Sequence, residues 1–482
     1  MSEANWLALG ALALHWLLVV GLSARIIMRR RPLGILLTWI ALILSVPVLG
    51  VLIYLIVGEN RVSRTYLRRV AATEEQYGRW KASLAGHAAV SPSAPAPETA
   101  ALQRLAHTLV GFPSMGGNAV QLLQDCEGIF AAVGADIRHS RHSCHLEFYL
   151  WEAGGRADMI LDELLRAASR GVRCRILLDA VGSKSFLKSD AAQRLRDAPG
   201  VELAAALPVG PVSALFSRAD LRNHRKLVVI DGEIAYTGSQ NLVDPRLFKQ
   251  DEGVGQWIDA MVRAEGPAVE ALAGLFIQDW EVVTGQRLAD DEGPRPVAAR
   301  GPVTLQAVPS GPLRPLVIQQ LVIGTIYAAR RELVITSPYF IPDDSVLLAL
   351  VSAANRGVEV TVIVPARNDS RLVDYASRAI FDDLLAAGVR IAAFEGGLLH
   401  TKSITVDGEF SLFGSLNLDM RSLWLNFELT LFIYDAGLSS RIRDMQFRYL
   451  ADSSCLDADE YRSRPLSRRF LENAVHLVAP LL

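Results

Sequence analysis

The chain has 482 residues, which allows two or three domains and a substantial core. Its formal net charge is −2 at pH 7, so no overall positive field attracts nucleic acid, and an anion site must be built locally. The cysteines are scattered without C-x-x-C pairs, which argues against a disulfide scaffold and a zinc ribbon: Cys126, Cys144, Cys174 and Cys455.

Two apolar runs, Trp6–Ala24 and Leu33–Val57, open the chain. Each run is long enough for the roughly 20 residues that a bilayer-spanning helix needs. A signal peptide is the alternative for the first run, but "MSEANW" has no basic residue and no A-x-A-like site follows. The sequence therefore predicts two transmembrane helices within residues 1–60. Basic clusters follow both runs and leave the orientation undecided, and Pro47 with Gly50 could make the second segment broken or re-entrant.

Two stretches with the composition of linkers divide the remainder of the chain. Residues 61–100 are predicted to form a charged helical segment followed by a Pro/Ala/Ser linker. A second stretch at 285–302, rich in Gly, Pro and charged residues, separates two parts of similar length. We therefore predict one lobe at 101–290 and another at 291–482.

The two lobes repeat each other in sequence. "AASRGVRCRILLD" at 167–179 matches "AANRGVEVTVIVP" at 353–365. Each string reads as the end of a helix, a glycine consistent with its C-cap, and an apolar β-branched strand. Matched order in two halves predicts a single α/β unit that is used twice.

Each lobe also carries the same polar motif. "HRKLVVID" spans His224–Asp231 and "HTKSITVD" spans His400–Asp407, and each is followed by G-S-x-N. In a strand the histidine and the lysine, two residues apart, point to the same face. The chain has 6 lysines and 43 arginines, yet two of the lysines stand in these motifs, so chance is a poor explanation.

Two histidines without an obvious redox or metal set suggest phosphoryl chemistry. A neutral imidazole can attack phosphorus and form a phosphohistidine. A second, protonated imidazole can protonate the departing alkoxide and then deprotonate the next alcohol. We expect Lys226 and Lys402 to neutralise the non-bridging oxygens. Side chains after the following strands are expected to donate further hydrogen bonds to the substrate: Ser239, Asn241, Ser415 and Asn417.

The aspartates that close the two motifs are candidates for the catalytic set. A catalytic histidine needs a carboxylate that sets its tautomer. Asp231 and Asp407 are candidates for this role, although their spacing would equally suit a scaffold within the motif.

A second pair of carboxylates lies further along the chain. Glu428 follows His400 by 28 residues and could orient a histidine across the interface of the lobes, and Glu252 has the same spacing after His224. Local alignment of "QWIDAMVR" with "LNFELTLF" makes Asp259 the better counterpart of Glu428.

The paired motif with its G-S-x-N resembles the phospholipase D superfamily. Longer strings are similar to the bacterial cardiolipin synthase family: "VPVLGVLIYLIVGENR", "AYTGSQNLVDPRLFKQD", "GQWIDAMVRAEGP", "FEGGLLHTKS" and "GSLNLDMRSLWLNFE". The similarity covers nearly the whole chain. It implies an α/β fold of two duplicated α/β/α sandwich lobes with pseudo-twofold symmetry and an active site at their interface, preceded by two N-terminal transmembrane helices.

The resemblance also implies an activity. In this family two phosphatidylglycerols give cardiolipin and glycerol, without metal or nucleotide cofactor. The histidine of the first half is usually the nucleophile, which places that role on His224 and the acid/base role on His400. The implied partners are phosphatidylglycerol and other anionic lipids in the bacterial inner membrane, where the protein would be multi-pass, and no nucleic acid. A homo-oligomer stays open.

Three other functions remain as alternatives. A membrane-anchored phospholipase D would use the same intermediate but release phosphatidic acid to water. A soluble nuclease of the superfamily is disfavoured by the N-terminal hairpin and the near-neutral charge. A lipid-binding scaffold without activity would be expected to show a damaged motif, and both copies are intact.

Three further features allow two interpretations each. "HSRHSCH" at 139–145 could ligate zinc but reads better as a polar turn that enters a strand. Arg218, Arg222 and Arg225 could form a rim that faces a headgroup, or a solvated loop. The C-terminal segment 464–482 has an apolar face at helical spacing and three arginines, so it could lie on an anionic membrane surface or dock on the domain.

Overall fold

The computed structural model describes seven stretches of the chain: residues 3–28, 33–46, 48–59, 61–87, 97–210, 218–288 and 293–477. The chain divides into two compact units. The first contains Met1–Leu67 and Val209–Leu221, and the second contains Arg68–Pro208 and Arg222–Leu482.

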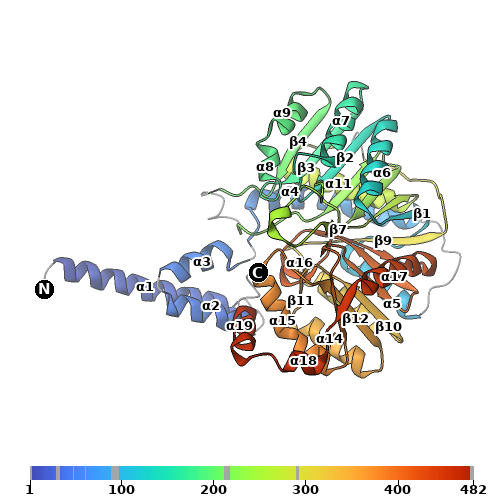
Figure 1. Cartoon of the computed structure of the whole chain (residues 1–482). Coiled ribbons are helices and arrows are strands. Elements are labelled where there is room, and N and C mark those ends of the chain that lie inside the picture. The colour runs from blue at the N-terminus through green and yellow to red at the C-terminus, as the bar shows by residue number, and fades with distance from the viewer. Residues whose placement is uncertain are drawn as a thin grey trace. The chain divides into compact units, whose positions relative to one another are not determined.

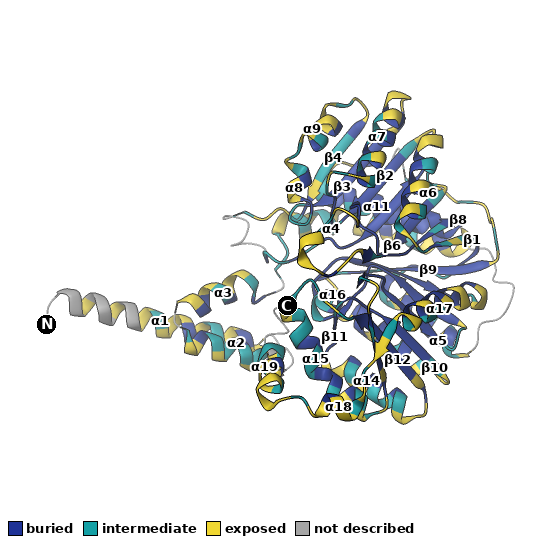
Figure 2. Cartoon of the chain, viewed as in Figure 1, coloured by how far each residue is buried: buried dark blue, intermediate teal, exposed yellow. Residues whose placement is uncertain are grey.

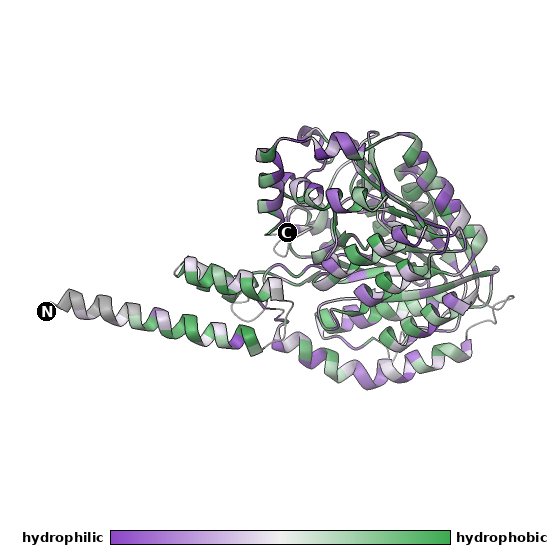
Figure 3. Cartoon of the chain, turned by 90° about the horizontal axis from the view of Figure 1, so that it is seen from below, coloured by the Kyte–Doolittle hydropathy of each residue, from purple (hydrophilic) through white to green (hydrophobic). Residues whose placement is uncertain are grey.

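The first unit consists mainly of apolar helices, and Figure 3 colours much of the described part of the N-terminal helix as hydrophobic. These helices are α1 (Glu3–Met28), α2 (Leu33–Ser45) and α3 (Leu49–Val57). Within the described stretches, no helix has both the length and the hydropathy that crossing a bilayer demands. Arg25 of α1 forms an ion pair with the buried Glu59 at 2.6 Å, and Tyr54 donates a hydrogen bond to the same carboxylate at 2.9 Å. These contacts fasten the end of α1 to the end of α3.

The second apolar run is divided into α2 and α3, as the proline and glycine in it suggested. Pro47 itself lies outside the described residues. Gly50 approaches the backbone of α2 so closely that a Cβ atom there would lie 2.4 Å from the carbonyl oxygen of Leu42. Only glycine fits this approach, and it lets Trp39 and Tyr54 meet edge to face with ring centroids 5.3 Å apart.

The second unit is built on one sheet of 15 strands (Figure 1). The first lobe contributes seven of them: β1 (Met115–Leu123), β2 (Ser143–Phe148), β3 (Arg173–Asp179), β4 (Val201–Ala206), β5 (Lys226–Ile230), β6 (Ile234–Gly238) and β8 (Met261–Glu265). The second lobe contributes the others: β9 (Val303–Ser310), β10 (Glu332–Thr336), β12 (Glu359–Pro365), β13 (Arg390–Phe394), β15 (Ser403–Val406), β16 (Phe410–Gly414), β18 (Glu428–Ile433) and β19 (Ser453–Cys455).

Strand order is the same in both lobes when it is followed outward from the centre. The first lobe runs β1-β8-β6-β5-β2-β3-β4, and the second runs β9-β18-β16-β15-β10-β12-β13, with β19 added at the outer edge. β1 and β9 pair antiparallel where the lobes meet, which is the pairing that a local twofold axis produces. The duplicated α/β fold is therefore confirmed, with the two sheets joined into one.

Helices cover both faces of the sheet. The described helices of this part of the chain are α4 (Arg64–His87), α5 (Pro97–Val110), α6 (Cys126–His139), α7 (Arg156–Ser169), α8 (Lys184–Leu187), α9 (Asp190–Asp197), the 3-10 helix η1 (Gln250–Glu252), α11 (Ala268–Thr284), α13 (Val317–Ala328), α14 (Asp344–Asn355), α15 (Arg371–Ala386), α16 (Met420–Trp424), α17 (Ala436–Ala451), α18 (Ala458–Arg462) and α19 (Leu466–His476). Figure 2 shows buried strands between helices whose outer sides are exposed. In β5, Leu227 and Val229 belong to the core beneath α11, whereas Val228 and Ile230 belong to the core beneath α6. This period-two alternation between two apolar layers makes an α/β/α sandwich.

Short parallel pairings cross between the lobes close to the two motifs. β7 (Trp257–Ile258) of the first lobe pairs with β14 (Leu398–Leu399) of the second, immediately before His400. Asn223, immediately before His224, forms the equivalent bridge with Phe427. Within the second lobe, β11 (Phe340–Ile341) pairs with β17 (Leu418–Asp419). The crossing pairs bring the two histidine segments to the interface of the lobes.

Candidate active site

His224 and His400 lie just before β5 and β15, and both line one cavity of about 400 Å³. The cavity takes residues from both lobes, and its wall contains Asn241 and Asn417 from the two G-S-x-N segments. Two imidazoles that are 176 residues apart in sequence (400 − 224) thus face one space. This is the arrangement that the duplicated motif predicted.

Each histidine is hydrogen-bonded to a carboxylate of the opposite lobe. His224 Nδ1 lies 3.0 and 2.9 Å from the two carboxylate oxygens of Glu428. His400 Nδ1 lies 2.6 Å from Asp259 Oδ1. A carboxylate at Nδ1 holds the proton on that nitrogen and leaves the lone pair of Nε2 available for chemistry. The structure thus places Asp259 where the local alignment predicted it, and Glu252 instead contacts Lys249.

The backbone repeats this crossed arrangement. The amide of His224 donates to the carbonyl oxygen of Phe427, the residue before Glu428, at 2.9 Å. The amide of His400 donates to the carbonyl oxygen of Ile258, the residue before Asp259, also at 2.9 Å. Both the ring and the main chain of each histidine are therefore held by the other lobe.

The two motif lysines are buried beside the histidines. Lys226 Nζ donates to the carbonyl oxygen of His224 at 2.8 Å, and Lys402 Nζ donates to that of His400 at 2.5 Å. Burial lowers the pKa of Lys226 to about 8, although Glu428 and Asp259 partly restore it, and it lowers the pKa of Lys402 well below its usual value. Such poorly hydrated ammonium groups gain strongly from an anionic phosphate, which explains their place in the site.

The pKa of each imidazole reflects its burial. Desolvation lowers the pKa of His224 to about 4, against the attraction of Glu428, and it lowers the pKa of His400 to about 4, against the attraction of Asp259. Conversely, although burial opposes it, attraction to His400 lowers the pKa of Asp259 to about 2. At neutral pH both rings are therefore neutral and both carboxylates are charged. An anionic phosphodiester between the rings would favour the protonated form of one of them.

The two serines of the G-S-x-N segments hold the carboxylates rather than a substrate. Ser415 Oγ donates to Glu428 Oε2 at 2.6 Å and accepts from the amide of Leu429 at 2.9 Å. Ser239 Oγ accepts from the amide of Ala260, the residue after Asp259, at 3.1 Å. Both serines are fully buried, and neither lines the cavity. The structure therefore does not bring these serines to the cavity, whereas Asn241 and Asn417 line its wall, and substrate binding by the four residues stays a prediction.

The aspartates that close the motifs lie at the far ends of their strands. The Asp231 carboxylate accepts backbone hydrogen bonds at 2.7 to 2.9 Å from three successive amides: Arg141, His142 and Ser143. The Asp407 carboxylate accepts three in the same way at 2.8 to 3.0 Å: Arg330, Arg331 and Glu332. Both aspartates have a left-handed backbone, with φ of 53° and 54°. Their geometry is that of a scaffold that joins neighbouring strands, which favours the second of the two roles that the sequence left open, and a catalytic role stays a prediction.

Aromatic rings beside the histidines were missed in the sequence. Tyr149 packs edge-on against His224 with ring centroids 5.1 Å apart, and Trp257 packs against His400 at 4.4 Å. Tyr149 directly follows β2 and Trp257 stands two residues before Asp259, so position relative to the strands was the only available signal. Both rings line the cavity and shield one side of each imidazole from water.

The arginines near the first motif have separate roles. Arg222 lines the cavity together with Arg421 and Lys249. Arg225 turns inward, pairs with Asp279 and donates to the backbone oxygen of Glu428 at 3.2 Å. Arg218 belongs to the first unit and pairs there with Asp220. Of the proposed rim, Arg222 alone lines this cavity.

The "HSRHSCH" stretch forms the end of α6 and the start of β2, as the polar-turn interpretation required. His139 Nδ1 lies 2.7 Å from the carbonyl oxygen of Ala135, one turn earlier on α6. His145 is buried and stacks on Phe276 with ring centroids 4.6 Å apart. These side chains point to different surroundings and do not form one ligand set.

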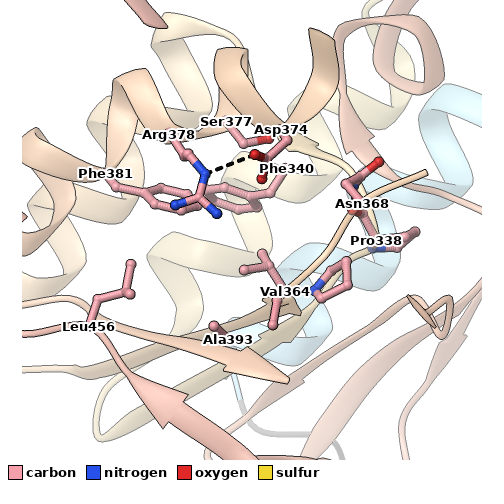
Figure 4. A pocket seen from close by; sticks show the side chains of 12 residues that line it. Pro338, Phe340, Val364, Asn368, Asp374, Ser377, Arg378, Phe381, Ala393 and Leu456 are labelled. Atoms are coloured by element: carbon pink, nitrogen blue, oxygen red, sulfur yellow. Dashed lines mark hydrogen bonds and ion pairs between the residues drawn. The ribbon is translucent and has the colours of Figure 1, made fainter. Parts of the chain in front are cut away.

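A second cavity lies beneath α15 (Figure 4). Its wall includes Phe340, Phe381 and Arg378, whose Nε donates to Asp374 at 2.9 Å. Its volume of about 30 Å³ holds only one or two water molecules. Of these two cavities in the described part of the chain, the one that contains the two histidines has room for a phospholipid headgroup and the one beneath α15 does not.

Comparison with known proteins agrees with this geometry. The family model described as "Cardiolipin synthase, PLD-like domain" matches residues 133–280 and 322–449, once in each lobe. Cardiolipin synthase A of Klebsiella pneumoniae (strain 342) is 43% identical over 485 residues, covering 100% of this chain and 99% of the relative. The chain belongs to this family.

Other relatives extend the comparison. Cardiolipin synthase A of Cronobacter sakazakii is 43% identical over 472 residues, covering 97% of both chains. The crystal structure of a phosphatidylserine synthase from Haemophilus influenzae aligns with a TM-score of 0.59 at 16% identity, covering 79% of this chain and 100% of that one. At this low sequence identity, the likeness shows that the two proteins share the same fold.

Proposed function

We propose that the protein is a cardiolipin synthase that transfers a phosphatidyl group from one phosphatidylglycerol to another and releases glycerol. The observation that carries this proposal is the pair of crossed His–carboxylate contacts that face one cavity, at 2.9 Å for His224 and 2.6 Å for His400. The full-length similarity to cardiolipin synthases supports the choice of substrate.

The proposed reaction has two displacements at phosphorus. Nε2 of His224 attacks the phosphodiester of the first phosphatidylglycerol, and the bond from phosphorus to the glycerol oxygen breaks. His400, protonated in the presence of the anionic substrate, gives its proton to the departing glycerol. His400 then takes the proton of a glycerol hydroxyl on the second phosphatidylglycerol. The new alkoxide attacks the phosphohistidine, forms cardiolipin and frees His224.

The remaining groups act on charge and orientation. Lys226 and Lys402 lie beside the reacting rings and would neutralise the non-bridging oxygens as charge develops. Glu428 and Asp259 would stabilise whichever imidazole becomes positive. Asn241 and Asn417 would donate amide hydrogen bonds to the phosphate from the cavity wall.

We place this chemistry at the bacterial inner membrane, with the two apolar runs of the N-terminal region as multi-pass anchors. In the described part of the first unit, large apolar side chains are exposed on α1, as expected for a helix that faces lipid: Trp16, Leu17, Val20 and Ile27. Arg25 lies at the end of the same helix, where a cation can reach the headgroups.

Purified protein in phosphatidylglycerol vesicles tests the proposed function. We expect cardiolipin and free glycerol in equal amounts, together with a radiolabelled phosphatidyl group that is trapped on His224 by acid quench. Phosphatidic acid as the main product would instead support the phospholipase D alternative. Because both reactions pass through the same phosphohistidine, the product ratio rather than the trapped intermediate separates them.

A further inference from the structure

The C-terminal helix α19 is docked on the domain with its charged side inward. It lies along α15 (Figure 1). Glu472 of α19 is fully buried and forms ion pairs with Arg464 and Arg468, each at 3.1 Å. Arg464 also pairs with Asp382 of α15 at 2.9 Å. A surface helix usually buries its large apolar side chains and exposes its carboxylates, whereas α19 buries Glu472 and leaves large apolar side chains exposed.

The outer side of α19 carries the apolar residues. Leu466 is 79% exposed, Phe470 is 77% exposed and Leu477 is 70% exposed. Their spacing of four and seven residues places them on one stripe of the helix. Arg469 follows the stripe on the next face of the helix and Arg462 precedes it at the end of α18, with 42% and 53% of their side chains exposed. An apolar stripe with cations at its edges matches the surface of an anionic bilayer.

The same helix adjoins the wall of the catalytic cavity. Val475 of α19 packs against a small cluster that includes Ile341 and Val373. Ile341 and Val373 also line the cavity with the two histidines. His476 Nδ1 lies 3.2 Å from the carbonyl oxygen of Ala376 in α15, which fixes this end of α19. Leu477, the next residue, is exposed. The C-terminal end of α19, which carries the exposed Leu477, therefore adjoins the cavity wall through Val475.

We propose that the exposed stripe of α19 inserts into the anionic bilayer surface and seats the mouth of the catalytic cavity on the lipid headgroups. The proposal rests on the proposed function, because contact between the stripe and a bilayer serves catalysis only if the substrate is a lipid. A bilayer fits better than a protein partner because the exposed arginines near the stripe, Arg462 and Arg469, complement anionic lipid. The inward ion pairs hold the helix on the domain while its apolar side enters the interface.

A pair of double variants tests the role of the stripe in catalysis. In L466Q/F470Q we expect at least about a tenfold loss of cardiolipin synthesis from phosphatidylglycerol vesicles, since two apolar side chains no longer enter the interface. Turnover of a monomeric short-chain phosphatidylglycerol should be unchanged. The control L316Q/L348Q removes exposed leucines elsewhere on the second lobe and should behave like the wild type in both assays. Equal losses on both substrates, or no loss on either, would overturn the proposal.

Lipid contact can be measured without turnover. In a C126S/C455S background, F470C and L348C are labelled with a fluorophore, and the full chain is placed in vesicles that contain nitroxide-labelled lipid. We expect quenching at position 470 in phosphatidylglycerol vesicles, weaker quenching in phosphatidylcholine vesicles, and none at position 348. Absence of quenching at position 470 would refute the inference, even if a second copy or the N-terminal region then covers this position. Quenching without cardiolipin synthesis would refute the proposed function and leave the inference standing.

Discussion

The two half-sites share a backbone frame but differ in the side chains around the histidine. Glu428 meets His224 through both carboxylate oxygens and accepts a further bond from Ser415. Asp259 meets His400 through one oxygen at 2.6 Å. Duplication preserved strand order, the crossed backbone bonds and the lysine positions, because these determine where the rings lie. The carboxylates and their partners diverged, which suits two rings that perform unequal steps.

The neighbouring aromatic rings extend this difference. Tyr149 meets His224 with its edge at an interplanar angle of 61°, whereas Trp257 is tilted by 42° and lies closer to His400. The two imidazoles therefore have different aromatic neighbours, although burial lowers the pKa of both to about 4.

Removing either histidine should have the largest effect. We expect H224A and H400A each to reduce cardiolipin formation by at least about a thousandfold, because each ring carries a separate bond-making or proton-transfer step. Acid quench after incubation with labelled phosphatidylglycerol should trap the phosphatidyl group in H400A but not in H224A. Thermal melting near that of the wild type is the control for folding. A label found on His400 in H224A would reverse the assigned roles.

Neutralising the carboxylates should have the next largest effect. We expect E428Q and D259N to reduce kcat by about a hundredfold, since the imidazole loses the group that fixes its tautomer. The conservative variant E428D should recover part of the activity. If E428Q kept full activity, Glu428 would have no positioning role and the crossed arrangement would be incidental.

The pH profile sharpens the same comparison. In the free enzyme the nucleophile must be neutral, so kcat/KM should fall as the pH drops through about 4, the pKa of His224. Glu428 raises that pKa, so E428Q should move the acid limb to lower pH. The folded pKa of each ring lies below the unfolded value near 6.5, so the rings contribute stability above that pH, which is lost as the pH falls towards 4. An acid limb that stays in place in E428Q would contradict this account.

Replacing the serines should reveal a smaller difference in activity between the two half-sites. Ser415 donates to Glu428 at 2.6 Å, whereas Ser239, which also helps to lower the pKa of Asp259, shares its hydroxyl with the backbone of Ala260. We therefore expect S415A to lower kcat by about tenfold and S239A by less, since loss of a charge-assisted bond costs about 1.5–3 kcal/mol. Steady-state kinetics of both variants at one pH make the measurement. Equal effects would show that the half-sites are energetically alike.

The motif aspartates should affect stability and not chemistry. In D231A and D407A three backbone amides lose their acceptor, which we expect to cost about 1–3 kcal/mol in the free energy of unfolding. The kcat of the folded fraction should be unchanged. Chemical denaturation with an activity assay on the remaining folded protein measures both quantities. A loss of kcat without a loss of stability would restore the catalytic role of these residues.

Repetition made much of this molecule predictable from sequence. Two copies of one pattern fixed the α/β class, located both histidines and, through local alignment, paired Glu428 with Asp259. The roles of single polar residues were harder to predict. Asp231 lies five positions beyond Lys226, which at about 3.3 Å per residue puts it some 16 Å away along the strand. The motif sequence does not indicate that the Asp231 carboxylate binds the neighbouring turn.

Local spacing also left the orientation of elements undetermined. In α19 the periodicity revealed an apolar stripe but not which side of the helix faces the domain, because the buried side is held by ion pairs to Arg464 and Asp382. The G-S-x-N segments similarly gave the position of Ser415 but not the direction of its hydroxyl. In each case a partner distant in sequence determined the outcome, and a single sequence does not display such partners.

The crossed contacts have an evolutionary consequence. A lone lobe would hold a histidine whose carboxylate partner is missing, but two identical lobes related by a twofold axis would complete each other. In such a homodimer every substitution appears on both sides of the axis, so its two rings must remain chemically identical. Fusion of the copies into one chain removes that constraint. It is the step that allowed a glutamate to stand behind one ring and an aspartate behind the other.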